Sequence, residues 1–282
     1  MSTSKNLILP YNLSMKQLLF LGLLYLLTIP FAEARLIGGN LADKNSYRST
    51  VYNGSCTGTK IGPKTLLFAA HCFLDSDTRR LKTQYSNNAR FILETHYGVF
   101  YPVTVENVYT HPTYAAELIR LARVRQSDFS VGSGSYDVAI MKIKEETPSI
   151  PVGTIDYSPS EIGDDVIIGG YGCEDTATIL SKTKGHRFKV AAVKVEPDPQ
   201  ISRVQGQNSA NMYRFNFFTT GIKKDARAAS ICPGDSGGPV YRNRKVIGVN
   251  ATYLFLDRSG VAQYNAHARL ADIKDWIESI PQ

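Results

Sequence analysis

Residues 232–239 read Cys-Pro-Gly-Asp-Ser-Gly-Gly-Pro, and the run that follows them predicts a β-hairpin. This run extends from Val240 to Val249 and turns near Asn243. Elsewhere, short runs rich in Val, Ile, Phe, Tyr and Thr are mostly separated by Gly, Pro, Asn, Asp or Ser clusters. They cover 51–52, 65–68, 91–93, 99–108, 138–143, 166–168, 188–195, 213–219 and 246–253. Their spacing predicts an all-β fold, either a barrel or a sandwich.

The clearest helical pattern lies at the C-terminal end of the chain. Apolar residues recur there at helical spacing, with charged residues between them, so we expect a helix over 270–280 that packs an apolar stripe on the β-structure. These apolar residues are Leu270, Ile273, Trp276, Ile277 and Ile280. A weaker helical pattern covers 114–124. The segment 148–158 contains two prolines and a glycine, and we interpret it as a linker between two halves.

The composition is that of a globular chain. Of its 282 residues, 43% are hydrophobic and 20% are charged, which excludes a disordered or collagen-like protein. The 32 Lys and Arg exceed the 25 Asp and Glu, but these basic residues are scattered along the sequence. We therefore expect a solvated surface and no nucleic-acid partner.

The N-terminal segment has the pattern of a secretory signal peptide. Residues 18–29 are nearly all apolar, Lys16 precedes them, and an Ala-Glu-Ala sequence ends at residue 34. The apolar run is too short for a comfortable membrane span. We interpret 1–34 as the signal peptide, with 1–14 as an extension from a mis-called start codon. The mature protein is then expected to be secreted or periplasmic and to lack a membrane anchor.

All four cysteines lie in the expected mature chain, at Cys56, Cys72, Cys173 and Cys232. Export makes disulfides possible, and four cysteines allow three pairings between which spacing alone does not choose. Metal binding is the alternative. Because the sequence has no C-x-x-C pair, we expect disulfides and no metal.

Three segments carry residues suited to nucleophilic catalysis. They are Leu-Phe-Ala-Ala-His-Cys at 67–72, Tyr-Asp-Val-Ala-Ile at 136–140, and the serine-containing stretch at 232–239. A serine hydroxyl needs an adjacent base such as histidine, and a buried carboxylate can orient and stabilise that histidine. The N–H groups of Gly234 and Ser236 could bind a developing oxyanion, and one such donor stabilises the transition state by about 3–4 kcal/mol.

These three segments resemble those of the chymotrypsin/trypsin family of secreted serine endopeptidases. The motifs Ala-Ala-His-Cys, Asp-Val-Ala-Ile and Gly-Asp-Ser-Gly-Gly-Pro stand in the family's order, and the resemblance covers a peptidase domain of 36–282. It implies two six-stranded antiparallel β-barrels, roughly 36–150 and 159–269, with the active site in the cleft between them.

The resemblance also implies the catalytic roles. His71 would be the general base, Asp137 the carboxylate that orients it and Ser236 the nucleophile, with Gly234 and Ser236 supplying the oxyanion hole. The chain would then hydrolyse peptide bonds through an acyl-enzyme intermediate without a cofactor. Its expected partners are protein or peptide substrates and a protein protease inhibitor, and the protein is expected to be a monomer.

The stretch Arg-Leu-Ile-Gly-Gly at 35–39 is similar to the family's activation site. Cleavage after Arg35, a pro-segment of one residue, would free the amine of Leu36. The resemblance implies that this amine pairs with Asp235 and thereby orders the oxyanion loop and the specificity pocket. A single extra residue would prevent the amine from reaching its partner.

The same resemblance implies the disulfides. Cys56 and Cys72 match the pair that braces the loop of the catalytic histidine. The usual partner of Cys232 follows the serine, where this chain has no cysteine. Cys173 follows a Gly-Tyr-Gly segment that the family places beside the oxyanion loop, so Cys173–Cys232 is the implied second pair.

The expected specificity pocket departs from the trypsin type. Ser230, six residues before the catalytic serine, replaces the Asp that binds Lys or Arg, so a basic preference is not implied. Ala251 aligns with the serine that usually hydrogen-bonds the catalytic Asp, and Tyr253 aligns with the glycine at the pocket mouth and would narrow it. Asn265 is expected on the far wall of the pocket, with His267 nearby.

Two other functions compete with this interpretation. The glycines at 234–238 also fit the nucleophile elbow of an α/β-hydrolase esterase, for which Asp257 and His267 could supply the acid and the base. That fold needs alternating strands and helices before the serine, and this sequence has strands and turns. A protease-like protein that only binds its partners usually lacks a triad residue, whereas all three are present here. The other histidines, His96, His111, His186 and His267, are expected to be structural.

Overall fold

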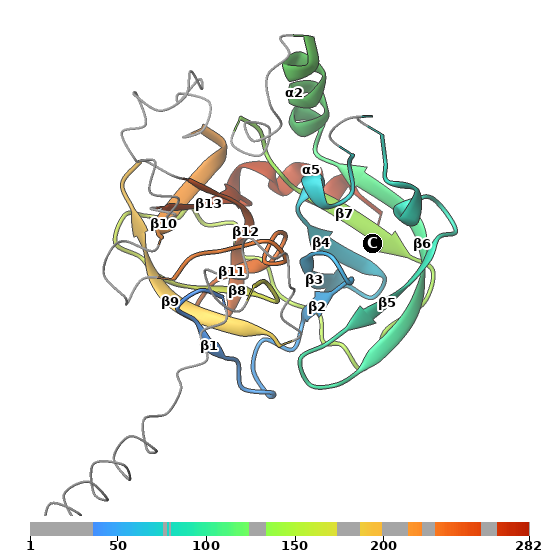
Figure 1. Ribbon diagram of the computed structural model, residues 1–282, viewed down its shortest axis with the longest axis horizontal. Coiled ribbons are helices and arrows are strands. Elements are labelled where there is room, and N and C mark those ends of the chain that lie inside the picture. Colours follow the sequence, from blue (N-terminus) through green and yellow to red (C-terminus); the bar gives the residue numbers. More distant parts are fainter. Residues whose placement is uncertain are drawn as a thin grey trace, which may run out of the picture. The chain divides into compact units, whose positions relative to one another are not determined.

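The computed structural model describes residues 36–75, 78, 80–123, 134–173, 187–198, 214–221, 229–254 and 264–281. The expected signal peptide, Arg35, His186 and Asp257 lie outside these residues. The described residues form two closed barrels of antiparallel strands, which confirms the expected fold class (Figure 1). Among them, no helix combines the length and the apolar character needed to cross a membrane.

The first barrel closes in the order β2-β3-β4-β7-β6-β5. Its strands are β2 Thr50–Tyr52, β3 Thr57–Gly62, β4 Thr65–Phe68, β5 Arg90–Glu94, β6 Phe100–Thr110 and β7 Ala139–Ile143. Every residue of β4 and β7 is buried, and the two strands pair with Leu67 opposite Ile140 and Phe68 opposite Ala139. This register brings the residues after β4 next to those before β7.

The second barrel is built from β8 Asp165–Gly170, β9 Lys189–Glu196, β10 Asn216–Thr220, β11 Pro239–Arg242, β12 Lys245–Leu254 and β13 Tyr264–Arg269. It closes because β8 pairs with both β9 and β11. The short strand β1 Asn40–Leu41 pairs with the free edge of β9. The expected hairpin is β11–β12, whose turn residues Asn243 and Arg244 have φ of 52° and 64°, as a tight two-residue hairpin turn requires.

Helices are short and flank the barrels. The weaker helical pattern corresponds to α2 Pro112–Arg123, and the turns η1 Ala70–Cys72 and η2 Thr83–Tyr85 follow β4. The C-terminal helix begins as a 3₁₀ turn, η4 Ala271–Ile273, and continues as α5 Lys274–Ser279. Its apolar residues other than Trp276, which is partly buried, lie in a core cluster with Val51 and Met141 of the first barrel and Val249 of the second. This packing agrees with the expectation from the periodicity.

The segment between the barrels is extended rather than helical. Ile150 is buried in the core of the first barrel, and Ile155 forms a parallel bridge to Val246 of β12. The amide of Asp156 also donates to the carbonyl of Val246, at 2.9 Å. The proline-containing stretch therefore contacts both barrels.

Candidate active site

His71 and Asp137 meet at the end of the β4–β7 pair. His71 lies in η1 just after β4, and Asp137 lies two residues before β7. The imidazole Nδ1 lies 2.6 Å from Asp137 Oδ2, and the backbone N–H of His71 donates to Oδ1 at 2.9 Å. Asp137 is fully buried, whereas the imidazole is 34% exposed. The carboxylate thus binds the ring at Nδ1 and the backbone at N–H, and it leaves Nε2 uninvolved.

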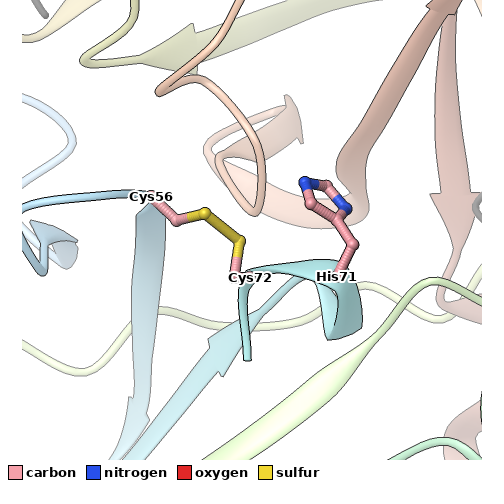
Figure 2. A group of neighbouring side chains, drawn as sticks. All are labelled: Cys56, His71 and Cys72. Carbon is pink, nitrogen blue, oxygen red and sulfur yellow. A yellow bond between two sulfur atoms is a disulfide. The ribbon is translucent and has the colours of Figure 1, made fainter. Parts of the chain in front are cut away.

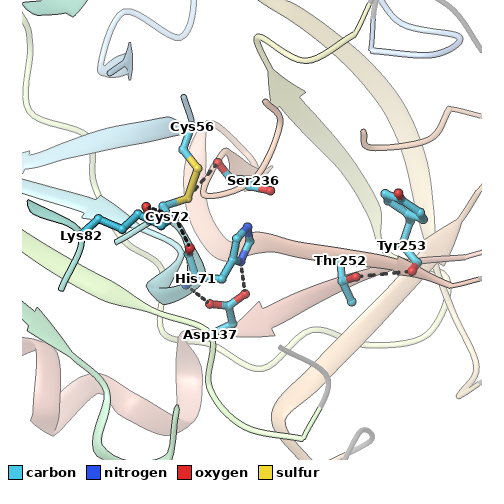
Figure 3. Close-up of polar contacts among 8 residues, drawn as sticks. All are labelled: Cys56, His71, Cys72, Lys82, Asp137, Ser236, Thr252 and Tyr253. Carbon is cyan, nitrogen blue, oxygen red and sulfur yellow. Dashed lines mark hydrogen bonds and ion pairs between the residues drawn. A yellow bond between two sulfur atoms is a disulfide. The ribbon is translucent and has the colours of Figure 1, made fainter. Parts of the chain in front are cut away.

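Figure 3 shows the His71 ring between the carboxylate of Asp137 and the loop that carries Ser236. The carbonyl of Ser236 accepts a hydrogen bond from the N–H of Thr57 at 3.0 Å, and it lies 3.9 Å from Cys72 Sγ. The backbone of Ser236 therefore contacts Thr57 and Cys72, and Cys72 directly follows the histidine in the sequence. The structure brings all three expected catalytic residues into one region, at the junction of the two barrels.

Thr57 lies on the first barrel and anchors residues 232–238, here called the serine loop. No sequence motif pointed to this residue. Its hydroxyl donates to the carbonyl of Gly234 at 2.7 Å and accepts from the N–H of Tyr171 at 3.0 Å. Its own N–H faces the carbonyls of Gly234 and Ser236 at 3.1 and 3.0 Å. Its place directly after Cys56 was the only available signal.

The serine loop requires glycine at two positions. Gly234 and Gly237 have φ of 104° and 80°, which L-residues with a side chain rarely adopt. A Cβ on Gly237 would lie 2.3 Å from the carbonyl oxygen of Thr57, and one on Gly234 would lie 2.9 Å from Gly172 Cα. At these two glycines, backbone atoms of the loop therefore pack directly against backbone atoms of both barrels.

The expected oxyanion donors are available in this loop. Within the part of the chain that the structure describes, the N–H groups of Gly234 and Ser236 donate to no other backbone carbonyl. The neighbouring N–H of Asp235 is used in the turn, where it donates to Cys232 O at 2.9 Å. The N–H of the serine itself and the N–H two residues before it thus form no backbone hydrogen bond among the described residues.

Asp235 belongs to the serine loop, between Gly234 and Ser236, and is fully buried. Its Oδ1 accepts from the N–H of Gly172 at 2.7 Å, and its Oδ2 accepts from the N–H of Cys232 at 2.9 Å. Burial raises the pKa of Asp235 to about 7, against the opposing effect of these two bonds and of the charge of Lys189. Leu36, its expected partner after cleavage, is also fully buried.

The expected activation segment, residues 36–39, is docked on the residues just before the serine loop. Ile37 bridges Ser230, whose N–H donates to the Ile37 carbonyl at 2.9 Å. Leu36 has φ of 46° and packs with Ile231 in the core of the second barrel. The segment that would carry the new N-terminus thus already touches the expected pocket.

The expected pocket residues lie together on the second barrel. Ser230 and Ala251 are buried, and Tyr253 is half-buried, which raises the pKa of its phenol. Asn265, expected on the far wall, is fully buried. Its Oδ1 accepts from the N–H of Ile231 at 2.9 Å, and its Nδ2 lies 3.1 Å from the Ala229 carbonyl. The amide side chain of Asn265 therefore ties β13 to the segment that carries Ser230.

His267 is a buried link in a polar chain rather than a surface group. Its Nδ1 lies 2.9 Å from Asn250 Oδ1, and its Nε2 lies 2.9 Å from Thr219 Oγ1. Full burial lowers the pKa of His267 to about 3, so the ring is neutral. Asn250 in turn donates to the Asp235 carbonyl at 3.3 Å, and Thr219 accepts from Asn265 at 3.1 Å. These bonds connect the serine loop to the pocket.

A profile of the trypsin family matches residues 36–277. The chain belongs to the trypsin family. Serine protease SSP1 of Scolopendra subspinipes is 28% identical over 245 residues, covering 80% of this chain and 76% of its own length. Trypsin-4 of Rattus norvegicus is 25% identical, covering 77% and 78%. In fold, the chain is similar to a mutant of human heparin binding protein, with a TM-score of 0.61 and 16% identity over 86% of this chain and 95% of that one.

This trypsin-family chain contains two disulfides in the described residues, Cys56–Cys72 and Cys173–Cys232. They are the pairs that the resemblance implied. Figure 2 shows Cys56 and Cys72 beside His71, and potential ligand atoms of the three residues lie within 4.8 Å of one another. Metal binding by cysteine requires thiolates, and both sulfurs are bonded to each other here. This cluster therefore braces the histidine turn and does not form a metal site.

Lys82 supports the histidine, and His111 packs beside the segment that carries Asp137. Lys82 donates to the carbonyls of His71 and Cys72 at 3.1 and 2.9 Å (Figure 3). His111, expected to be structural, lies edge-on to Tyr136, the residue before Asp137, and to Trp276 of α5. Its burial lowers its pKa to about 4. No sequence motif pointed to Lys82, whereas the structural role expected for His111 agrees with this packing.

Proposed function

We propose that this chain is a secreted serine endopeptidase that uses Ser236, His71 and Asp137 as its catalytic residues. Membership of the trypsin family supports a serine protease. The observation that carries the finer assignment is the 2.6 Å contact between His71 Nδ1 and the fully buried Asp137 carboxylate, with Nε2 left on the accessible side. A buried carboxylate in this position favours the imidazolium that forms during catalysis.

The proposed reaction proceeds in two halves. Ser236 Oγ attacks the scissile carbonyl carbon while His71 Nε2 takes the hydroxyl proton. The oxyanion of the tetrahedral intermediate accepts hydrogen bonds from the N–H groups of Gly234 and Ser236. The C–N bond then breaks, His71 gives its proton to the leaving amine, and an ester remains on Ser236. A water molecule, deprotonated by His71, hydrolyses that ester by the same route.

We further propose activation by cleavage between Arg35 and Leu36 after removal of the signal peptide 1–34. Burial raises the pKa of Asp235, and the hydrogen bonds and the charge of Lys189 offset this effect only in part. A free α-ammonium on Leu36 would supply a further positive charge inside the barrel. The docking of Ile37 on Ser230 supports this route, because it holds the activation segment close to the serine loop.

For the residue before the scissile bond, we propose a small or medium uncharged side chain. Ser230 presents a hydroxyl where a basic side chain would need a carboxylate, and Asn265 and Tyr253 reduce the space in the same region. An unpaired buried charge costs several kcal/mol, which disfavours Lys and Arg.

The proposed function is tested by labelling the cleaved, folded protein with a fluorophosphonate and by profiling it against a peptide library. We expect labelling that the Ser236→Ala variant lacks, together with cleavage of peptides. A folded, cleaved protein that neither labels nor cleaves would instead support a protease-like binding protein. Rapid turnover of lipid esters without peptide cleavage would support an esterase.

A further inference from the structure

Lys189 is a fully buried lysine in the second barrel, and the proposed mechanism does not use it. It is the first residue of β9, where it pairs with Gly170 of β8 on one side and with Leu41 of β1 on the other. Lysine is almost never fully buried without a partner, because its charge loses its hydration. The position of this ammonium group therefore requires an explanation.

The strand register places Lys189 on the face that carries Asp235. A Cβ added to Gly170 would lie 2.0 Å from Asp235 Oδ1, so the carboxylate occupies the space where a Gly170 side chain would project. In an antiparallel pair, directly opposite residues project from the same face with Cβ atoms about 4.5–5.5 Å apart. Because Lys189 is opposite Gly170, its side chain leaves the sheet beside the Asp235 carboxylate.

The same side chain reaches the activation segment. Lys189 Nζ lies 3.4 Å from the carbonyl of Gly39, which is in the turn closed by the bond from the Gly39 N–H to the Leu36 carbonyl. Among the described residues, Lys189 is the cation whose charge lowers the pKa of Asp235. One ammonium group thus acts on both the carboxylate and the turn that follows the expected cleavage site.

We propose that Lys189 is an internal counter-ion of Asp235 that keeps the serine loop ordered while the Arg35–Leu36 bond is intact, and so gives the precursor a basal peptidase activity. This inference rests on the proposed function. The Leu36 ammonium adds a second cation after cleavage, so processing raises the activity further. Lys189 acts through Asp235 and is a positioning residue, not a catalytic one.

The experiment uses the full chain with Arg35→Gln, which blocks cleavage, and measures the rate of fluorophosphonate labelling. Into this precursor we would introduce Lys189→Gln, which removes the charge, and Lys189→Arg, which keeps it. Lys60→Gln is the matched control, because Lys60 is also buried and donates to two carbonyls, of Thr147 and Ile150, but lies in the first barrel. Wild-type chain cleaved by immobilised trypsin serves as the processed reference.

We expect the Arg35→Gln precursor to label clearly faster than its Ser236→Ala counterpart and more slowly than the processed chain. Lys189→Gln should slow labelling of the precursor by about tenfold or more, because it leaves a buried charge unpaired. The same substitution should slow the labelling of the processed chain by less than about threefold, because the Leu36 ammonium then pairs with Asp235 in place of Lys189. Lys189→Arg and Lys60→Gln should leave the precursor rate within about twofold.

Two outcomes would overturn the inference. One is a precursor that labels no faster than its Ser236→Ala counterpart while the processed chain labels; this result needs no Lys189 variant and holds even if Lys189→Gln fails to fold. The other is a Lys189→Gln precursor that labels as fast as its parent. A processed chain that does not label at all contradicts the proposed function itself, and with it this inference.

Discussion

At the scale of single residues, the geometry of the site depends on how deeply each polar side chain is buried. Asp137 is fully buried and is bonded twice to His71, whereas the histidine ring remains partly exposed. The carboxylate can therefore orient the ring while Nε2 stays open to substrate. In the proposed mechanism, this division of roles would let His71 remove the proton of the Ser236 hydroxyl at neutral pH.

The first prediction concerns the nucleophile and its base. Ser236→Ala and His71→Ala should each lower kcat by about 10⁴-fold or more, and the double variant should be no worse than either, because the two residues act as one unit. Peptide turnover is the measurement, and thermal unfolding is the control that each variant folds. A double variant much less active than both single variants would argue against a shared role.

The second prediction concerns the residue before the scissile bond. Between Arg227 and Tyr241, the only acid is Asp235, which belongs to the serine loop and has its carboxylate bonded to Gly172 and Cys232. A peptide panel varying this one residue should therefore favour Ala, Val or other uncharged side chains over Lys and Arg. Each Å² of apolar surface buried there contributes about 25 cal/mol. A clear preference for Arg or Lys would show that the pocket has been assigned to the wrong residues.

At the scale of elements, strand pairing decides which distant residues meet. The β4–β7 register brings His71 next to Asp137. Thr57, the first residue of β3, contacts the serine loop. In the second barrel, β10, β12 and β13 align Thr219, Asn250 and His267 into one buried polar chain. None of these contacts is local in sequence.

The third prediction tests the anchor on β3. Thr57→Val removes the hydroxyl that bonds Gly234 and Tyr171, so it should destabilise the fold by about 1–3 kcal/mol. It should also lower kcat about tenfold or more with little change in KM, since the serine loop loses its position. Thr59→Val is the matched control on the same strand. Thr59 is also buried, but within the described residues its hydroxyl has no hydrogen-bond partner. Equal effects of both substitutions would contradict a specific role for Thr57.

The fourth prediction follows from the neutral, buried His267. Its pKa in the folded state, about 3, lies below the ordinary value of 6.5, so between these values the unfolded chain binds one proton more. The stability that this residue contributes is complete above pH 6.5 and falls by about 1.4 kcal/mol per pH unit as the pH decreases below it. Urea unfolding should therefore show the stability difference between wild type and His267→Gln shrinking by about 2 kcal/mol from pH 7 to pH 5.

The difference should be constant above pH 7, where both states are neutral at this position, which provides an internal control. Comparing two variants also cancels the opposite effect of Asp235, whose raised pKa favours the folded state toward low pH. A difference that does not change between pH 7 and pH 5 would mean that the folded protein accepts a proton on His267.

At the scale of the whole molecule, the serine loop is the place where both barrels and the activation segment meet. Thr57 holds it from the first barrel, and Gly172 and Asn250 hold it from the second. Asp235 lies at its centre, fully buried. In the proposed activation, the charge balance around this one carboxylate would couple cleavage of the chain to the geometry of the site.

The fifth prediction is that Asp235→Asn cripples the processed enzyme. Removing one partner of a buried ion pair costs about 3–5 kcal/mol, which corresponds to a loss of activity of at least about a hundredfold. Intact mass should show that the fully active form begins at Leu36. A form that retains Arg35 yet has the full activity of the processed chain would contradict activation through the new N-terminus.

Much of this description could be predicted from the sequence, because its physical basis is local. Short β-rich runs separated by turn residues predicted the all-β fold, and apolar residues at helical spacing predicted the helix near 270–280. The β11–β12 hairpin turns at Asn243, as expected. Short motifs also pointed to Ser236, His71 and Asp137. Each signal depends on neighbouring residues, whose spacing sets a turn, a strand or a helix.

Only the tertiary structure decided the partners of these residues. Thr57, Lys82 and Lys189 carry no motif, and their roles arise from strands and turns that pair across long stretches of sequence. The sequence favoured a structural role for His267 and left an esterase base as the alternative, and its complete burial between Asn250 and Thr219 makes it a neutral structural link. Burial and register depend on the whole chain, so no local pattern of residues encodes them.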